Sequence, residues 1–429
     1  MSDLVVRGGQ VLTPTERVDA DVVIRSGWIA AVLPRDGDAF PPTDLPVVDA
    51  SGMLVTPGFV DLQCNGAAGI DLTAEPERLA ELSTLLPRWG VTAWLPTIVT
   101  SPPSIRTRTL AALAASQQNG VGAAALGVHF EGPFLAPERR GAHAPAHLVA
   151  PDPALVEGWS RDAGVAVVTL APELPGAFEV IRRLVGAGVV VSLGHSSATA
   201  DEATAAVDAG ARWATHLFNA MPPLHHRDPG LGGVALTDER LSVGVIVDGL
   251  HLHPTVVRLA ARALGQRLTL VTDAVAALGV RPGPIRLGDV EALSDGEGVR
   301  LADGTLAGSV LAMDQAIANT VRFAGVTVEA AVAAATVQPA RLLGVDHERG
   351  VVAPGSHGDL VLLDDTLRVA TTIIAGTVSY SRADTTDGSV TATQDHSGGA
   401  AVATQGGRVG SGGGWRPGPT SRSQNESEV

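Results

Sequence analysis

The amino-acid sequence predicts an α/β fold, a (β/α)8 TIM barrel with a small β-sandwich domain built from the N- and C-terminal segments. Three observations lead to this prediction. Short, almost continuously apolar strand candidates recur through the middle of the chain, helix-like stretches ending in glycine separate them, and both ends alternate apolar runs with turn residues. Repeated β–α units with nearly continuous apolar strands favour a closed parallel barrel. An open, doubly wound sheet is the alternative.

The barrel is predicted to span residues 57–344. Between its strands lie stretches such as ERLAELSTLLPRWG and TADEATAAVDAG, which read as helices because a glycine stops each one. The strand candidates are residues 59–63, 92–99, 124–132, 165–173, 189–195, 213–219, 243–249 and 268–274.

The small β-domain is predicted from residues 1–56 and residues 345–380. Runs such as DVVIRSGWIAAVL near the start and GDLVLLD near the end read as short antiparallel strands. Because chain termini often lie close together, we expect the two segments to pair. Residues 381–429 are rich in Gly, Ser and Thr and poor in large apolar side chains, so we predict a disordered tail.

The composition excludes several classes of function. A chain of 429 residues that is 45% hydrophobic and 17% charged is ordinary for a globular enzyme. Its net charge of −15 and the lack of a basic cluster argue against a nucleic-acid partner. No apolar run is long enough for a membrane span. The single cysteine, Cys64, and the absence of a secretory signal predict a cytoplasmic location.

Polar side chains follow strand after strand at the carboxyl ends, where TIM barrels carry their chemistry. Glu131, His195 and His216 form a plausible metal set, because a carboxylate and two imidazoles suit Zn²⁺ and leave a position open for water. Such a metal acidifies its bound water. Asp273, after the last strand, can take that proton and pass it to a leaving amine. The pattern therefore predicts hydrolysis.

Single residues in this pattern also have structural interpretations. Asp273 alone could cap a helix. His129 is expected to make structural hydrogen bonds, and Asp61 is expected to orient its neighbours. Glu173 reads equally as barrel packing or as support for neighbouring polar groups. It is the agreement of several strands that favours a functional site.

Several motifs between about residues 3 and 380 resemble, in order, those of the N-acetylglucosamine-6-phosphate deacetylase family of the amidohydrolase superfamily. They are PGFVDLQCNG, GVHFEGPFLAPERRGAHAP, VSLGHSSAT, THLFNAMPPLHHRDPGLGG, VIVDGLHLHP, LVTDA and TLAGSVLAMDQA. The resemblance implies hydrolysis of N-acetyl-D-glucosamine 6-phosphate to D-glucosamine 6-phosphate and acetate, in amino-sugar catabolism. Two alternatives stay open: a relative acting on another N-acetylated amino-sugar phosphate, such as N-acetylgalactosamine 6-phosphate, and a non-catalytic barrel.

The resemblance also implies a role for each motif residue. Glu131, His195 and His216 would hold one divalent metal ion per subunit, Zn²⁺ in the first place, with Fe²⁺, Co²⁺ or Mn²⁺ as alternatives. Asp273 would be the general base and then the general acid, and His143 would polarise the acetamide carbonyl. Similar enzymes form homodimers, so Arg227 is a candidate to act across the subunit interface. The implied substrate contacts are Ala142, His143, Asn219, Ala220, Arg227, His251, Leu306, Ala307 and Gly308.

The strand PGFVDLQCNG departs from the wider superfamily, in which a His-x-His pair is expected. This chain has Gln63 and Asn65 at those positions, and an amide is a poor ligand for a transition metal when His and carboxylate compete. We therefore expect a site with one metal. Gln63 and Asn65 would support it by hydrogen bonds to water or to a ligating group.

Overall fold

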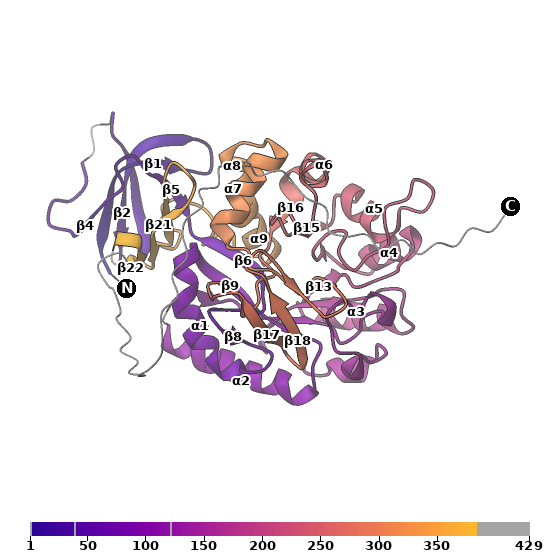
Figure 1. Cartoon of the computed structure of the whole chain (residues 1–429). Coiled ribbons are helices and arrows are strands. Elements are labelled where there is room, and N and C mark those ends of the chain that lie inside the picture. Colours follow the sequence, from indigo (N-terminus) through magenta and orange to yellow (C-terminus); the bar gives the residue numbers. More distant parts are fainter. Residues whose placement is uncertain (1, 38–39, 121, 384–429) are drawn as a thin grey trace, which may run out of the picture. The chain divides into compact units, whose positions relative to one another are not determined.

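The structure is a computed structural model that describes residues 2–37, 40–120 and 122–383. From residue 384 onward, the tail predicted to be disordered lies outside the described residues. The described chain belongs to one compact unit, which contains a parallel barrel sheet and a smaller sheet (Figure 1). Within it, no helix is long and apolar enough to cross a membrane.

The barrel sheet forms from the predicted strand candidates. Its strands pair in parallel, with β6 beside β9 and β11 to β16 following in chain order. A parallel bridge between Cys64 and Ala274 links the first strand to the segment after the last. The predicted (β/α)8 class is confirmed. The barrel strands are β6 (Phe59–Cys64), β9 (Val91–Val99), β10 (Ala124–Ala125), β11 (Val128–Glu131), β12 (Val165–Leu170), β13 (Val190–Leu193), β14 (Trp213–Ala214), β15 (Ser242–Val245) and β16 (Leu268–Leu270).

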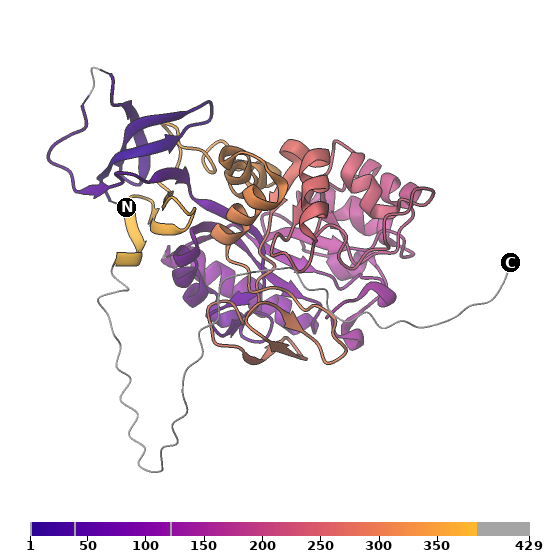
Figure 2. The same cartoon turned by 45° about the horizontal axis from the view of Figure 1, so that its top comes forward.

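Helices lie around the barrel strands, as Figure 2 shows. The sequence explains their ends: Thr199 and Glu202 form a reciprocal capping box at the start of α4, and Gly90 in the left-handed conformation ends the segment before β9. The helices are α1 (Leu79–Leu85), α2 (Pro103–Asn119), α3 (Ala177–Gly186), α4 (Ala200–Asp208), α5 (Gly230–Thr237), α6 (Pro254–Leu264), α7 (Met313–Ala324), α8 (Val328–Ala335) and α9 (Val337–Leu342).

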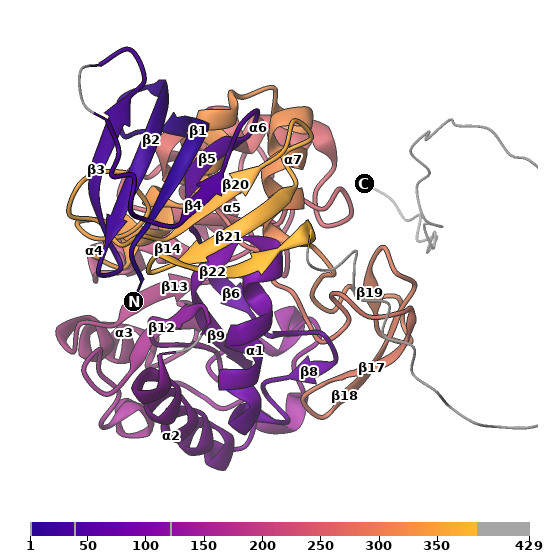
Figure 3. The same ribbon diagram turned by 90° about the vertical axis from the view of Figure 1, so that its left-hand side faces the viewer.

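The smaller sheet joins the two ends of the chain (Figure 3). Its strand order is β22-β21-β20-β5-β1-β2-β3, with β4 beside β1, so the antiparallel pair of β5 and β20 connects N- and C-terminal segments. Valine, leucine and isoleucine side chains of both segments form its buried core. The strands are β1 (Leu4–Leu12), β2 (Arg17–Arg25), β3 (Trp28–Pro34), β4 (Val47–Asp49), β5 (Leu54–Pro57), β20 (Leu360–Leu363), β21 (Val369–Ile374) and β22 (Thr377–Ser381).

A small antiparallel sheet inside the barrel segment was not predicted. It consists of β17 (Gly283–Leu287), β18 (Val290–Ser294) and β19 (Val299–Arg300). Its signal was the alternation of apolar and polar residues on both sides of Gly288, whose positive φ of 57° suits a tight turn. The loop that follows β19 contributes to the site described below. A two-stranded ribbon, β7 (Gly66–Ala67) and β8 (Ile70–Asp71), also follows the first barrel strand.

Candidate functional site

A cavity of about 740 Å³ opens at the carboxyl ends of the barrel strands. Its wall includes Asn65, Glu131, His195, His216 and Asp273. Glu131 is the last residue of β11, and the other four lie one to three residues after β6, β13, β14 and β16. The topology therefore brings together polar residues that lie far apart in the sequence.

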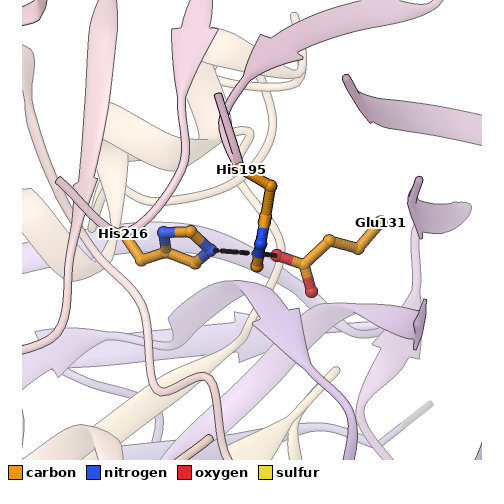
Figure 4. Close-up of side chains that lie close together, drawn as sticks. All are labelled: Glu131, His195 and His216. Carbon is orange, nitrogen blue, oxygen red and sulfur yellow. Dashed lines mark hydrogen bonds and ion pairs between the residues drawn. The ribbon is translucent and has the colours of Figure 1, made fainter. Parts of the chain in front are cut away.

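Glu131, His195 and His216 converge within this cavity (Figure 4). The Oε1 atom of Glu131 lies 3.0 Å from Nε2 of His216 and 3.2 Å from Nε2 of His195. The two imidazole nitrogens are 3.0 Å apart. All three side chains are buried. The structure thus brings the predicted metal set to a common point.

The chemistry of these atoms fits a divalent metal ion. The backbone carbonyl of Arg139 lies 2.8 Å from Nδ1 of His195 and can only accept a hydrogen bond, so Nδ1 carries the hydrogen. A neutral His195 then presents the lone pair of Nε2 to its neighbours. Lone-pair-bearing atoms at this spacing require a cation or protons between them. The cluster could therefore bind a metal.

The carboxyl group of Glu131 remains ionised in this cluster. Burial acts to raise its pKa, but where protons lie between these atoms, hydrogen bonds from His195 and His216 outweigh burial and hold the pKa well below its usual range. An ionised carboxylate is the form that binds a metal.

Three residues of the site have a strained backbone. The φ angles of His195, His216 and Asp273 are 49°, 29° and 47°, in the left-handed region that residues other than glycine rarely adopt. Such strain persists only where the surrounding structure enforces it. At Asp273, the N–H donates to the carbonyl of Gln63 and the carbonyl accepts from the N–H of Ser309, both at 2.8 Å. Hydrogen bonds to neighbouring segments therefore fix the turn that carries this carboxyl group.

Only one oxygen of the Asp273 carboxyl group accepts hydrogen bonds from the described side chains. Its Oδ1 atom accepts hydrogen bonds from Nδ2 of Asn65 at 2.7 Å and from Nε2 of Gln63 at 3.1 Å. No described residue donates to Oδ2. Burial, with the nearby charge of Glu131, raises the pKa of Asp273 to about 7. A carboxyl group with such a pKa is well matched to proton transfer near neutral pH.

Gln63 connects the two carboxylates. Its Nε2 atom donates to Oε1 of Glu131 and to Oδ1 of Asp273, both at 3.1 Å. The hydroxyl of Thr215 donates to Oε1 of Gln63 at 2.5 Å, which fixes the orientation of the amide. This role of Thr215 was not predicted from the sequence. Its position directly before His216 was the available signal.

Asp61 accepts hydrogen bonds from residues that belong to this network or adjoin it. Its Oδ2 accepts from the hydroxyl of Thr272 at 2.5 Å, and its Oδ1 accepts from the backbone N–H groups of Gln63 and Thr272 at 3.2 and 3.3 Å. Burial raises the pKa of Asp61 to about 6. The geometry agrees with the expectation that Asp61 orients its neighbours, because Gln63 and Thr272 flank the catalytic candidates.

His143 presents an N–H group to the cavity. The backbone N–H of Thr100 donates to its Nδ1 at 3.1 Å, so the hydrogen of the neutral ring is on Nε2. Nε2 lies 3.7 Å from Oε2 of Glu131. Burial lowers the pKa of His143 to about 3. His143 is therefore a neutral donor beside the candidate metal-binding cluster.

Four of the substrate contacts implied by the resemblance, Asn219, Ala220, Arg227 and His251, divide into two groups. Asn219, Ala220 and His251 line the cavity. The ring of His251 is anchored by Asp248, whose Oδ2 lies 2.6 Å from Nδ1. Arg227, in contrast, does not line the cavity; its exposed guanidinium lies 2.8 Å from Nε2 of His226.

The other predicted contacts lie mostly in the cavity wall. Ala142, Leu306 and Gly308 line it, whereas Ala307 is buried in a small apolar cluster behind it. Sequence reasoning missed Arg140 and Arg300, which also line the cavity. The signal for Arg140 was its place in the ERRGAHAP motif, while Arg300 belongs to the unpredicted small sheet.

Two ambiguous residues have clear structural surroundings. His129 is fully buried, with Nε2 2.7 Å from the hydroxyl of Thr169 and Nδ1 3.2 Å from the carbonyl of Leu62, and burial lowers its pKa to about 4. It is a satisfied core residue. Glu173 accepts hydrogen bonds from the Ser196 hydroxyl at 2.7 Å and the Ser197 N–H at 2.5 Å, so it supports the loop after His195.

Comparisons with known proteins identify the class of this chain. Residues 54–379 match the amidohydrolase family. An N-acetylglucosamine-6-phosphate deacetylase from Danio rerio is 42% identical over 347 residues, 77% of this chain and 85% of the relative. An N-acetylgalactosamine-6-phosphate deacetylase from Escherichia coli O157:H7 is 38% identical over 365 residues, 83% and 96% of the two chains. The chain therefore belongs to the amidohydrolase family.

Solved structures agree with this assignment. N-acetylglucosamine-6-phosphate deacetylase from Pasteurella multocida aligns with a TM-score of 0.82 and 30% identity, over 88% of this chain and 99% of the other. A mutant of the Mycobacterium smegmatis enzyme, in complex with N-acetyl-D-glucosamine-6-phosphate, aligns with a TM-score of 0.81 and 36% identity, over 89% and 100%. The resemblance to the N-acetylglucosamine-6-phosphate deacetylases is confirmed.

Proposed function

We propose that this chain is a metal-dependent hydrolase that converts N-acetyl-D-glucosamine 6-phosphate and water to D-glucosamine 6-phosphate and acetate. The observation that carries the proposal is the buried cluster of Glu131, His195 and His216, which shares a cavity with a proton-transfer carboxyl group and a neutral N–H donor. The names of the relatives supply the substrate class.

Glu131, His195 and His216 would hold the metal ion, and Zn²⁺ is the proposed species. Fe²⁺, Co²⁺ and Mn²⁺ also accept this set of ligands, so availability can decide among them. When bound, a divalent metal supplies Lewis acidity, which acidifies water and polarises the amide carbonyl. Because Gln63 and Asn65 stand at the carboxyl end of the first strand, where the wider superfamily has a His-x-His pair, we propose one metal ion per subunit.

The residues of the chain supply the proton transfers. Asp273 takes one proton from the attacking water on Oδ2, while the water oxygen bonds to the acetyl carbon. His143 donates its Nε2–H to the carbonyl oxygen as negative charge develops there. Asp273 then returns the proton to nitrogen as the C–N bond breaks. The amine is free, the new carboxyl group keeps the second proton of the water until it ionises to acetate, and Asp273 ends as it began.

The phosphate would bind at the end of the cavity near His251, Asn219 and Ala220. Arg227 lies outside the cavity of its own chain, which supports a role across the interface of a homodimer. Mixing Arg227→Ala subunits with Asp273→Asn subunits tests this role. If Arg227 acts in trans, subunit exchange creates one intact site per heterodimer and activity rises; if it acts in cis, no site is intact and activity does not rise.

A second substrate has specific support. The N-acetylgalactosamine-6-phosphate deacetylase from Escherichia coli O157:H7 matches this chain over 96% of its own length. N-acetyl-D-galactosamine 6-phosphate is therefore the alternative substrate of the same chemistry. A cytoplasmic location is part of the proposal and stays a prediction from the single cysteine.

Acetate release tests the function directly. The full chain is assayed with both epimers, after removal of metal by a chelator, and after return of Zn²⁺, with Glu131→Gln as the variant unable to complete the cluster. We expect turnover that disappears with the metal and returns with Zn²⁺. Full turnover in metal-free protein contradicts the metal mechanism. No turnover of either epimer, with near-zero metal after reconstitution, supports a non-catalytic barrel instead.

A further inference from the structure

The side-chain oxygen of Asn65 is a buried acceptor with no donor. Asn65 is 2% exposed and lines the cavity beside Asp273 and the metal cluster. Its Oδ1 atom is buried, and no described residue donates a hydrogen bond to it. A buried acceptor without a partner costs about 1–3 kcal/mol. A ligand that brings a donor to this point would remove that cost.

The orientation of the Asn65 amide is fixed by its neighbour. Nδ2 donates to Oδ1 of Asp273 at 2.7 Å, and the same Oδ1 also accepts from Nε2 of Gln63, so it acts as an acceptor. A flipped amide would place two acceptors against each other. Oδ1 of Asn65 is therefore the amide atom that has no donor among the described residues, next to the carboxyl group of Asp273.

We propose that Oδ1 of Asn65 accepts the hydrogen bond of the substrate's acetamide N–H and keeps this contact with the amine product. The inference rests on the proposed function and adds a catalytic residue to it. The scissile acetamide group carries one donor, its N–H, and one acceptor, its carbonyl oxygen. His143 presents its N–H, and a metal ion held by Glu131, His195 and His216 would supply positive charge; both suit the carbonyl oxygen. Asn65 is the complementary acceptor for the nitrogen.

This contact orients the leaving nitrogen. A hydrogen bond from N–H to Asn65 restricts rotation about the bond between the sugar and the nitrogen. When the acetyl carbon becomes tetrahedral, the nitrogen lone pair is then held where Asp273 can protonate it. Asn65 would also disfavour acyl groups that lack an N–H, because such a substrate leaves Oδ1 unpaired.

A comparison of amide and ester substrates tests this role. The substrates are N-acetyl-D-glucosamine 6-phosphate and the 2-O-acetyl ester of D-glucose 6-phosphate, which has the same carbonyl but no N–H. Asn65→Leu should lower kcat/KM for the amide by roughly 10–100-fold more than for the ester, as expected for loss of a contact to the N–H. Equal losses on both substrates overturn the proposal.

Gln63→Met is the matched control. Gln63 also donates to Oδ1 of Asp273, but its own oxygen is already satisfied by Thr215. Its substitution therefore disturbs Asp273 without removing an acceptor from the cavity, and it should lower kcat/KM for amide and ester to a similar extent. Metal content and thermal unfolding of both variants show whether each remains folded and loaded.

A binding measurement separates this inference from the proposed function. In calorimetric titrations of the metal-loaded protein, Asn65→Leu should weaken the binding of D-glucosamine 6-phosphate about tenfold. The binding of 2-deoxy-D-glucose 6-phosphate should not change, because this ligand has no hydrogen-bond donor at C2. Unchanged affinity for the amine overturns the role of Asn65 even if deacetylation is observed. Absence of deacetylation in the wild type overturns the function, while the titration still tests Asn65.

Discussion

Asp61 should make the stability of this protein depend on pH in a predictable direction. Burial raises its pKa from 3.8 to about 6 in the folded chain. Because the folded pKa lies above the unfolded one, the protonated form favours the fold. The stabilisation is complete below the unfolded pKa and is lost as the pH rises through about 6. At about 1.4 kcal/mol per unit of pKa, the full effect is about 3 kcal/mol.

Asp61→Asn removes this titration and keeps the shape of the side chain. Between pH 8 and pH 5, the wild type should gain about 1.4 kcal/mol of unfolding free energy relative to the variant. Urea unfolding of both metal-free proteins at several pH values measures the difference. Other titrating groups occur in both proteins and cancel. Parallel stability curves across this range would refute the reasoning, since they would show that Asp61 does not titrate there.

Two further predictions concern the hydrogen-bond network at the site. Asp273→Asn should lower kcat by about 10²–10⁴-fold and leave metal content unchanged, because Asp273 serves proton transfer and lies outside the metal cluster; acetate release and metal analysis check both parts, and near-normal kcat contradicts the role. Thr215→Val should lower the free energy of unfolding by about 1–3 kcal/mol, because Gln63 loses the donor to its buried oxygen. Thr215→Ser retains the hydroxyl and should keep most of the stability in the same urea assay.

Local patterns explain why much of the fold could be predicted. Most residues of the barrel strands are apolar, and a capping residue or a glycine marks helix ends such as the start of α4 and the end of α2, so these elements can be recognised within a few residues. The small sheet from β17 to β19 was missed although Gly288 and its flanking alternation were present. Its strands are short and half exposed, so their apolar signal is weak beside that of the barrel strands.

The sequence by itself determined which chemical groups follow the barrel strands, because motif residues such as Glu131, His195, His216 and Asp273 stand at strand ends that local pattern defines. Tertiary structure alone decided how these groups work. The N–H of Thr100 determines which ring nitrogen of His143 carries the hydrogen, and the hydroxyl of Thr215 orients the amide of Gln63. The side-chain oxygen of Asn65 is left without a donor among the described residues. These relations depend on distances of about 3 Å between residues far apart in the chain. No spacing within the sequence encodes them; they arise only when the barrel closes.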